Sequence, residues 1–209
     1  MKKAFLALIL PVAVQAAIVY DNSGTILDRS VQFSSGPYFE IGDEITLAGT
    51  ARLATQATVQ LWNDGAEGEF DLLLRFYDVG SPVGAQIGPT FTLTSLLAPA
   101  GSVINAVFTG LNVTLPDTVV FTLAVANASA GVDLGVDLFS PPVVGSSDAG
   151  YLVVNDGSFS QQGATGDANA YFVLDAADVG EVPEPAASLL VAAGLAGALA
   201  LRALTKTRQ

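Results

Sequence analysis

FDLLLRFY, from Phe70 to Tyr77, is the stretch that decides the fold. Its large apolar residues recur at every second position from Phe70 to Phe76, while Asp71 and Arg75 lie on the opposite face. This period of two residues is typical of a β-strand that buries one face. The same alternation recurs in three other sets: Val59 and Leu61; Val119, Phe121, Leu123 and Val125; and Val132, Leu134, Val136 and Leu138.

Turn-forming residues separate the predicted strands at short intervals. Asn63-Asp64-Gly65 and Asn155-Asp156-Gly157 each follow an apolar strand, and these residue types tolerate the positive φ angles of tight hairpins. The polar stretch Ser158–Asp167 predicts a surface loop before the last strand. Further strands are predicted at residues 18–20, 44–47, 91–94, 103–108, 111–115, 150–154 and 170–174.

Residues 17–179 show no helical period of useful length. Many short strands with Gly- and Pro-containing turns predict an all-β domain, a single antiparallel β-sandwich that is jelly-roll-like, with a closed barrel as the alternative. The stretch is long enough to bury one core without disulfides, and the chain contains no Cys.

The N-terminus carries the features of an export signal. Met1-Lys2-Lys3 is basic, and the run from Ala4 to Val14 is apolar. Small or tolerated residues follow up to Ala16. This pattern predicts a secretory signal peptide at residues 1–16, cleaved between Ala16 and Ala17 after export by the general secretion machinery.

The C-terminal segment has three parts. Pro183-Glu184-Pro185 ends a linker at residues 180–185, and its prolines hold it extended because they fix φ and lack an N–H. Residues 186–204 form a 19-residue apolar span once Arg202 is allowed to snorkel, which predicts a transmembrane helix. Arg202, Lys206 and Arg208 follow without an acid, so the tail at 205–209 is predicted to be cytoplasmic. A plain membrane anchor or a buried core helix is the alternative, although a core helix should show a polar face.

The order Pro-Glu-Pro, short apolar segment and basic end resembles the PEP-CTERM sorting signal of Gram-negative bacteria. The resemblance implies recognition by exosortase, a membrane-embedded cysteine protease-like enzyme, through Pro183, Glu184 and Pro185. It also implies residence in the inner membrane before processing, and the cell surface or extracellular matrix afterwards. The family is associated with exopolysaccharide and biofilm. The middle of the chain looks like the exported β-domains that often precede such signals, but this likeness supplies no functional residue.

The predicted exported part is strongly acidic. All 20 acids lie between Ala17 and Pro185, against only three basic residues, Arg29, Arg52 and Arg75, so this part carries a net charge of −17. Such a charge repels anionic partners and keeps a protein soluble. Nucleic-acid binding is excluded because it needs a basic surface.

Residue types needed for most catalysis are missing. The stretch from Ala17 to Leu201 has no His, Cys or Lys, which excludes Ser-His-Asp, Cys-His and Ser-Lys systems and the zinc sites built on His and Cys. No phosphate-binding glycine motif occurs either. The chain is therefore predicted not to be an enzyme. A glycosidase built on two carboxylates is the remaining catalytic alternative.

Calcium is the cofactor that the composition allows, because it takes oxygen ligands only. Asp64, Glu67 and Glu69 lie within a Gly-containing turn and are the candidate ligands. The alternative is that these carboxylates are simply solvated, as loop acids mostly are. Asp133 and Asp137 share a strand face, but four residues of extended chain separate them too far to hold one ion.

Trp62 is the only Trp and lies opposite the face formed by Val59 and Leu61, just before a turn. If exposed, it offers an aromatic platform for a carbohydrate; burial between the sheets or at a strand end is the alternative. The sequence thus predicts an exported, non-catalytic protein of the cell envelope or extracellular matrix. The alternatives are a carbohydrate-binding surface module that binds extracellular polysaccharide, with or without calcium, and a plain membrane-anchored surface protein.

Overall fold

The computed structural model describes residues 16–33, 39–80, 84–148, 150–155, 158–162 and 168–179. All of them belong to one compact unit, Gln15–Val179. The signal peptide before Ala16, the Pro-Glu-Pro motif, the 186–204 span and the basic tail lie outside the described residues and stay predictions. The described residues form no helix, and so none that is long and apolar enough to cross a membrane.

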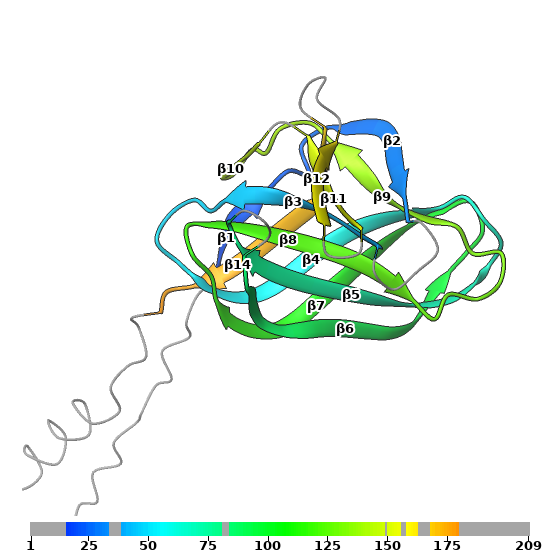
Figure 1. Cartoon of the computed structure of the whole chain (residues 1–209), viewed down its shortest axis with the longest axis horizontal. Helices are drawn as coiled ribbons and strands as arrows, with labels where there is room; N and C mark the ends of the chain where they lie inside the picture. Colours follow the sequence, from blue (N-terminus) through cyan, green and yellow to red (C-terminus); the bar gives the residue numbers. More distant parts are fainter. Residues whose placement is uncertain are drawn as a thin grey trace, which may run out of the picture. The chain divides into compact units, whose positions relative to one another are not determined.

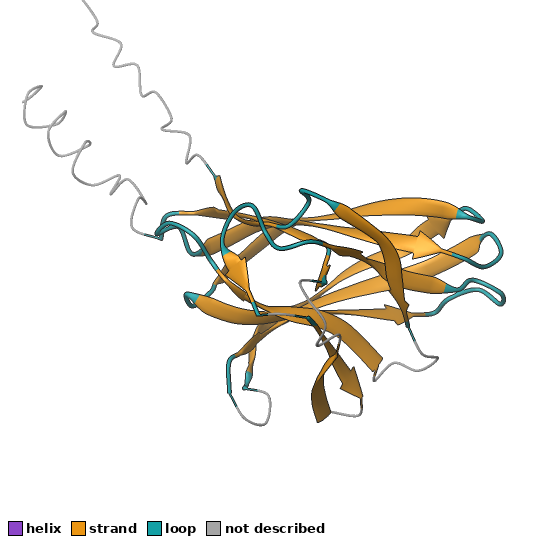
Figure 2. Ribbon diagram, turned by 90° about the horizontal axis from the view of Figure 1, so that it is seen from above, coloured by secondary structure: helices purple, strands orange, loops and turns teal. Residues whose placement is uncertain are grey.

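Fourteen strands make up the described part of the chain (Figure 1). In order they are β1 (Ala17–Asp21), β2 (Ile26–Gln32), β3 (Phe39–Thr46), β4 (Leu53–Asn63), β5 (Gly68–Asp78), β6 (Gln86–Ala98), β7 (Ser102–Thr114), β8 (Thr118–Ala126), β9 (Leu134–Phe139), β10 (Ser146–Ser147), β11 (Tyr151–Asn155), β12 (Ser158–Gln162), β13 (Asn169–Ala170) and β14 (Phe172–Ala177). They pair into two seven-stranded antiparallel sheets, which lie as two layers in Figure 2. The prediction of an all-β protein with two antiparallel sheets is confirmed.

Sheet A contains β1, β2, β4, β7, β9, β13 and β14, and β4 organises it. On one side β4 pairs with β7 along its whole length. Its other side is divided, because its first half pairs with β14 and its last three residues pair with β9. β1 then adds to β14, while β2 and β13 add to β9. The sheet therefore forks at β4.

Sheet B has the order β12-β11-β3-β8-β5-β6, and β10 also pairs with β3. The decisive stretch of the sequence is its strand β5, which lies between β8 and β6. The alternating residues Phe70, Leu72, Leu74 and Phe76 are fully buried, as the pattern predicts. Opposite them in the core, Phe172 of β14 stacks on Phe121 of β8, with ring centroids 3.9 Å apart and planes at 10°. This contact joins the two sheets.

One strand replaces two predicted ones. Residues 103–108 and 111–115 were predicted as separate strands, but β7 runs through both and pairs with β4 throughout. Gly110 and Asn112 have positive φ, and the register shifts there. The buried positions accordingly change from Ala106 and Phe108 to Leu111 and Val113. A bulge of this kind interrupts the alternation without ending the strand.

Strand β12 contradicts the prediction of a surface loop at Ser158–Asp167. Ser158–Gln162 pairs residue by residue with β11, from Asn155 opposite Ser158 to Tyr151 opposite Gln162. Only residues 156 and 157 lie between the strands, so Asn155-Asp156-Gly157 does lead into a hairpin. The strand was missed because it is an edge strand, which needs backbone partners but few apolar side chains.

The Asn63-Asp64-Gly65 turn does not close a hairpin. It leads from β4 in sheet A to β5 in sheet B, and neither Asp64 nor Gly65 is among the residues of positive φ. The Asn63 side chain shapes the turn instead, because its Oδ1 accepts the N–H of Gly65 at 3.0 Å. Asn favours turns as much through such local hydrogen bonds as through its tolerance of positive φ.

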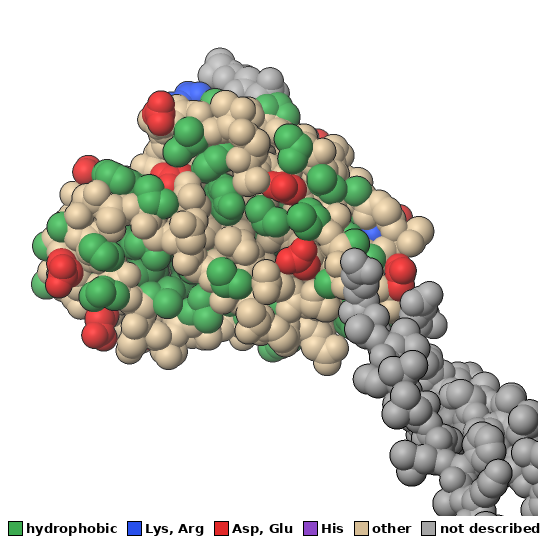
Figure 3. Space-filling view, turned by 180° about the vertical axis from the view of Figure 1, so that it is seen from behind, with side chains coloured by type: hydrophobic (Ala, Val, Ile, Leu, Met, Phe, Trp, Pro, Cys, Tyr) green, Lys and Arg blue, Asp and Glu red, His purple; other side chains and the backbone are tan. Residues whose placement is uncertain are grey.

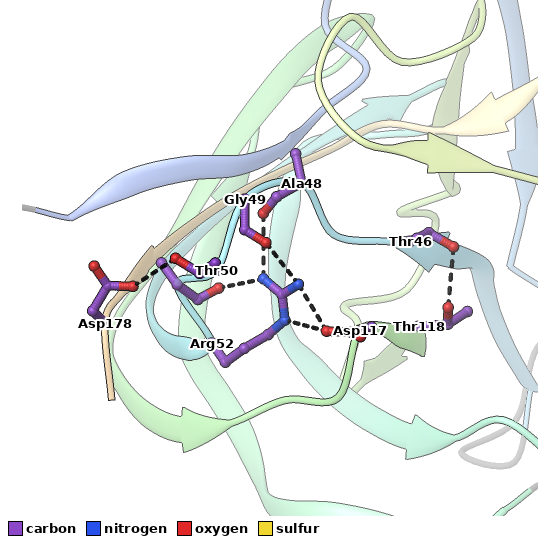
Figure 4. A network of polar contacts seen from close by, with 9 residues as sticks. Thr46, Ala48, Gly49, Thr50, Arg52, Asp117, Thr118 and Asp178 are labelled. Atoms are coloured by element: carbon purple, nitrogen blue, oxygen red, sulfur yellow. Dashed lines mark hydrogen bonds and ion pairs between the residues drawn. The ribbon is translucent and has the colours of Figure 1, made fainter. Parts of the chain in front are cut away.

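The domain begins and ends on adjacent strands, since Ala17 of β1 pairs with Ala176 of β14. Near this end Arg52 holds three carbonyl groups of the loop before β4, those of Ala48, Gly49 and Ala51 (Figure 4). Its Nε donates to Asp117 of the β7–β8 loop at 2.8 Å. In the same region the Thr50 hydroxyl donates to Asp178, directly after β14. These contacts fasten the end of the sandwich from which the chain continues to Gly180.

Candidate functional site

A pocket of about 360 Å³ opens on the outer face of sheet A. Trp62 of β4 forms part of the pocket wall. Its neighbours Leu61 and Asn63 are buried in the protein, so the Trp62 side chain lies on the outer face of the sheet. Trp62 pairs with Val103 of β7 on one side and with Gly135 of β9 on the other. It is partly exposed on this outer face, so it is not buried between the sheets, and its role as a carbohydrate platform stays a prediction. The full lining is Ile26, Asp28, Arg29, Ser30, Trp62, Val103 and Asp137.

Gly135 matters to this pocket because it puts no side chain beside Trp62. A Cβ at this position would lie 2.9 Å from the Gln32 side-chain oxygen and 3.0 Å from the carbonyl oxygen of Val31. Strand β2 therefore approaches β9 closely only because residue 135 is Gly. This close approach brings β2 against the pocket.

Strand β2 was not predicted, and it supplies most of the polar lining. Its pairing with β9 shifts between Ile26 and Ser30, and Asp28 within this bulge has a φ of 51°. Asp tolerates the left-handed region better than most residues. Asp28 and Arg29 are both exposed at the pocket, while Ser30 pairs with Asp137. The sequence ILDRSVQ alternates too weakly to reveal this strand.

Asp137 is the buried acid of the pocket. It is only 6% exposed, and its Oδ2 has no hydrogen-bond partner. Burial raises the pKa of this carboxyl to about 6. The charged groups that line the pocket with it are Asp28 and Arg29 of β2. Within the described part of the chain Arg29 forms no ion pair, because the two ion pairs there are Arg52–Asp117 and Arg75–Glu40.

The pocket combines an aromatic side chain, apolar groups and unsatisfied polar groups. Val103 and Ile26 are each 45% exposed at its rim. Next to Trp62 on the same face, Gln60 donates to Asn105 at 3.0 Å, so amide groups continue the surface along β4 and β7. A ligand with an apolar face and several hydroxyl groups matches this mixture.

A second polar group, on sheet B, is structurally complete. Glu40 is 8% exposed and accepts hydrogen bonds from Arg75 at 2.6 Å, from the Tyr77 hydroxyl at 3.3 Å and from the Thr122 hydroxyl. Burial and the neighbouring Glu40 raise the pKa of Tyr77. Because the Glu40 carboxylate has a cation and two hydroxyl donors, its charge is balanced and its oxygens are hydrogen-bonded within the protein.

A third polar group lies buried between the sheets and contrasts with the second. Asp43 of β3 is fully buried, and no donor reaches its Oδ1 with hydrogen-bond geometry. Burial raises the pKa of Asp43 well above its ordinary range, an effect that the adjacent N–H of Glu44 only partly offsets and that Asp148 increases. The Tyr20 hydroxyl is also buried without a hydrogen-bond partner of good geometry, and burial and Asp43 raise its pKa. The sequence could have indicated this buried acid, because Asp43 interrupts the apolar positions 39, 41 and 45 of one strand face.

The three predicted calcium ligands lie in the turn between β4 and β5 and at the start of β5, and calcium binding there stays a prediction. Asp64, Glu67 and Glu69 are all exposed. The backbone N–H of Asp64 donates to the carbonyl of Asp133, and that of Glu69 to the Ser129 hydroxyl. Across the described residues, no three His, Cys, Asp or Glu side chains are grouped so that they could hold a metal ion.

The predicted signal-peptide cleavage bond lies where β1 starts. Ala16 and Ala17 are both exposed, and Ala17 is the first residue of the strand. The sorting residues Pro183, Glu184 and Pro185 and the basic residues Arg202, Lys206 and Arg208 lie outside the described residues. Comparison of the chain with known protein families, with curated proteins and with solved structures finds no match.

Proposed function

We propose that this chain is an exported, non-catalytic protein of the cell envelope or extracellular matrix that binds an uncharged polysaccharide in the Trp62 pocket. The observation that carries the proposal is the partly exposed Trp62 beside the unpartnered Oδ2 of Asp137. The ring supplies an apolar surface for one face of a sugar. The carboxylate, Ser30 and Arg29 supply partners for its hydroxyl groups.

The class of polysaccharide follows from charge. The predicted exported part carries −17, and acidic side chains are scattered over the face in Figure 3 among neutral and apolar ones. A polyanion would be repelled over the whole approach to the protein. An uncharged glycan avoids this cost, and the amide pair Gln60–Asn105 offers further hydrogen bonds to a chain that extends beyond the pocket.

Location is proposed from the two ends of the sequence. The signal peptide at 1–16 and the PEP-CTERM-like segment at 182–208 agree on one topology, with the β-domain exported and the tail inside. We propose exosortase as the processing partner and a jelly-roll-like sandwich as its cargo. The mass of the protein recovered from the native cell tests this directly. A mature chain that still carries residues 189–209 would leave a plain membrane-anchored protein.

Glycan binding is tested by calorimetry with the full-length protein and uncharged oligosaccharides selected on a glycan array. Trp62→Ala is expected to weaken binding at least about 10-fold, because stacking on a sugar is lost. Leu97→Ala is the matched control, since Leu97 is a 58% exposed apolar side chain on β6 of the other sheet. Equal affinity of the wild type and the Trp62→Ala variant would refute the assignment of the pocket.

A glycoside hydrolase is the second candidate, because two carboxylates line the same pocket. Asp137, with a pKa of about 6, has the property of a general acid, and Asp28 would be the second carboxylate. The assay is the release of new reducing ends from any glycan that binds. Release that disappears in Asp137→Asn would establish the enzyme. Binding without release supports the non-catalytic proposal.

A further inference from the structure

The buried group around Asp43 is incomplete in a way that the group around Glu40 is not. Glu40 has Arg75 as its cation, together with two hydroxyl donors. Asp43 is more deeply buried, yet neither ion pair of the described residues includes it. A buried carboxylate without a compensating charge is costly, so Asp43 must either hold a proton or be paired with a cation.

Oxygen atoms gather at the same place. One atom of the Asn169 side-chain amide lies 3.0 Å from Asp43 Oδ2, 3.0 Å from the carbonyl oxygen of Asp148 and 2.9 Å from the Ser147 hydroxyl. With nitrogen in that position, Asn169 donates to these oxygens. Asp43 Oδ1 and the Tyr20 hydroxyl still have no hydrogen-bond partner of good geometry, although the Glu44 N–H lies near Asp43 and the Ser147 hydroxyl lies near Tyr20. Hydrogen bonding within the group therefore satisfies Oδ2 of Asp43 and leaves Oδ1 without a donor of good geometry.

With the amide oxygen in that position, the same atoms form a set of ligands. Neighbouring oxygens around a calcium ion, each about 2.4 Å from the metal, lie about 3 Å apart. The separations around Asn169 have this size. Carboxylate, amide, hydroxyl and carbonyl oxygens are also the donors that calcium prefers. Glu44 and Asp148 add negative charge close to Asp43.

We propose that this group binds one calcium ion, with Asp43 as the carboxylate ligand and Asn169 Oδ1, Ser147 Oγ and the carbonyl oxygen of Asp148 as neutral ligands. The ion supplies the positive charge that allows Asp43 to be ionised while buried. It also joins both sheets, because Asp43 and Ser147 belong to β3 and β10 of sheet B and Asn169 to β13 of sheet A. The site is separate from the Trp62 pocket and from the turn at Asp64–Glu69, and it does not depend on the proposed glycan binding.

The first experiment measures the thermal unfolding of the full-length protein after chelation and again with calcium. At a calcium concentration about 100-fold above Kd, the midpoint is expected to rise by about 5–10 °C. Asp43→Asn should abolish this shift. Glu67→Gln is the matched control and should keep it, because Glu67 is exposed in the turn. A shift lost in Glu67→Gln but kept in Asp43→Asn would overturn the proposal.

The second experiment decides the matter if Asp43→Asn does not fold. Terbium occupies calcium sites and emits when an adjacent tyrosine is excited, and Tyr20 lies beside Asp43. Wild-type protein should give terbium emission that calcium displaces, and Tyr20→Phe should lose most of that emission while keeping the calcium-dependent midpoint. Absence of both terbium emission and a calcium-dependent midpoint in the wild type would show that Asp43 is a neutral buried acid.

Discussion

The Asn63 side chain connects three loops at one end of the sandwich through hydrogen bonds. It is fully buried, and its Nδ2 donates to the carbonyl oxygens of Ala66, Ala98 and Pro99. Its Oδ1 accepts the N–H groups of Gly65 and Asp133. The loops after β4, β6 and before β9 thus meet on a single amide.

Asn63→Ala is expected to lower the free energy of unfolding by about 2–4 kcal/mol, because buried backbone groups lose their partners. Urea unfolding followed by circular dichroism measures the loss. Asn105→Ala is the control, since Asn105 has one hydrogen bond to Gln60 on the outer surface. A change within about 0.5 kcal/mol, as for ordinary surface substitutions, would show that water or other groups take over the role of Asn63.

Asp137 predicts a pH dependence of stability. Its pKa is raised to about 6 in the folded protein from an ordinary value of 3.8, so the folded state binds the proton more tightly than the unfolded state. The contribution of this carboxyl to stability is therefore fully present below about pH 4 and is lost as the pH rises to about 6. The free energy of unfolding of wild type minus that of Asp137→Asn should decrease across this window and stay constant above it. A difference independent of pH would contradict the assignment.

At the scale of elements, the loop before β4 depends on Arg52. The guanidinium is 15% exposed and holds three carbonyl oxygens, whereas its ionic partner Asp117 is 84% exposed. An exposed carboxylate contributes little, because solvent screens it. Arg52 therefore stabilises the loop mainly through the hydrogen bonds that its planar guanidinium donates to backbone carbonyls.

Arg52→Ala is expected to cost about 2–3 kcal/mol, and Arg52→Lys should recover only a small part of this loss, because one ammonium group cannot reach all three carbonyls. Asp117→Asn should cost less than about 1 kcal/mol. Chemical unfolding of the three variants gives the comparison. If Asp117→Asn were as damaging as Arg52→Ala, the ion pair would be the main contribution.

Strands with a strict alternation were predictable, and strands that owe their place to backbone pairing were not. β5 and β8 bury Leu72, Leu74 and Phe121 as the pattern indicates. β2 and β12 are outer strands with polar sequences, so periodicity does not mark them. The candidate pocket was found only in part for this reason. Trp62 was identified from the sequence, but Asp28, Arg29 and Ser30 come from β2, and their position depends on Gly135.

At the scale of the whole molecule, the excess of acids predicts a dependence on salt. Repulsion among carboxylates destabilises the compact state more than the expanded one. Raising NaCl from about 10 mM to about 150 mM shortens the Debye length from about 30 Å to about 8 Å and should raise the melting temperature by a few degrees. KCl at equal ionic strength should give the same shift, since screening does not depend on the cation. A melting temperature that falls with salt would mean that attractive ion pairs outweigh the repulsion.

The fork of sheet A at β4 has a mechanical consequence. Trp62 lies near the C-terminal end of β4. The N-terminal part of β4 pairs with β14, after which the chain continues beyond Val179. The two strands are antiparallel, so a pull on the proposed polysaccharide at Trp62 and a pull on the chain after β14 would act along the strand axis in opposite directions. Their hydrogen bonds stand perpendicular to that axis and would share the load simultaneously instead of opening one at a time. If the proposed polysaccharide binds at Trp62, β4 and β14 would therefore resist such a pull in shear.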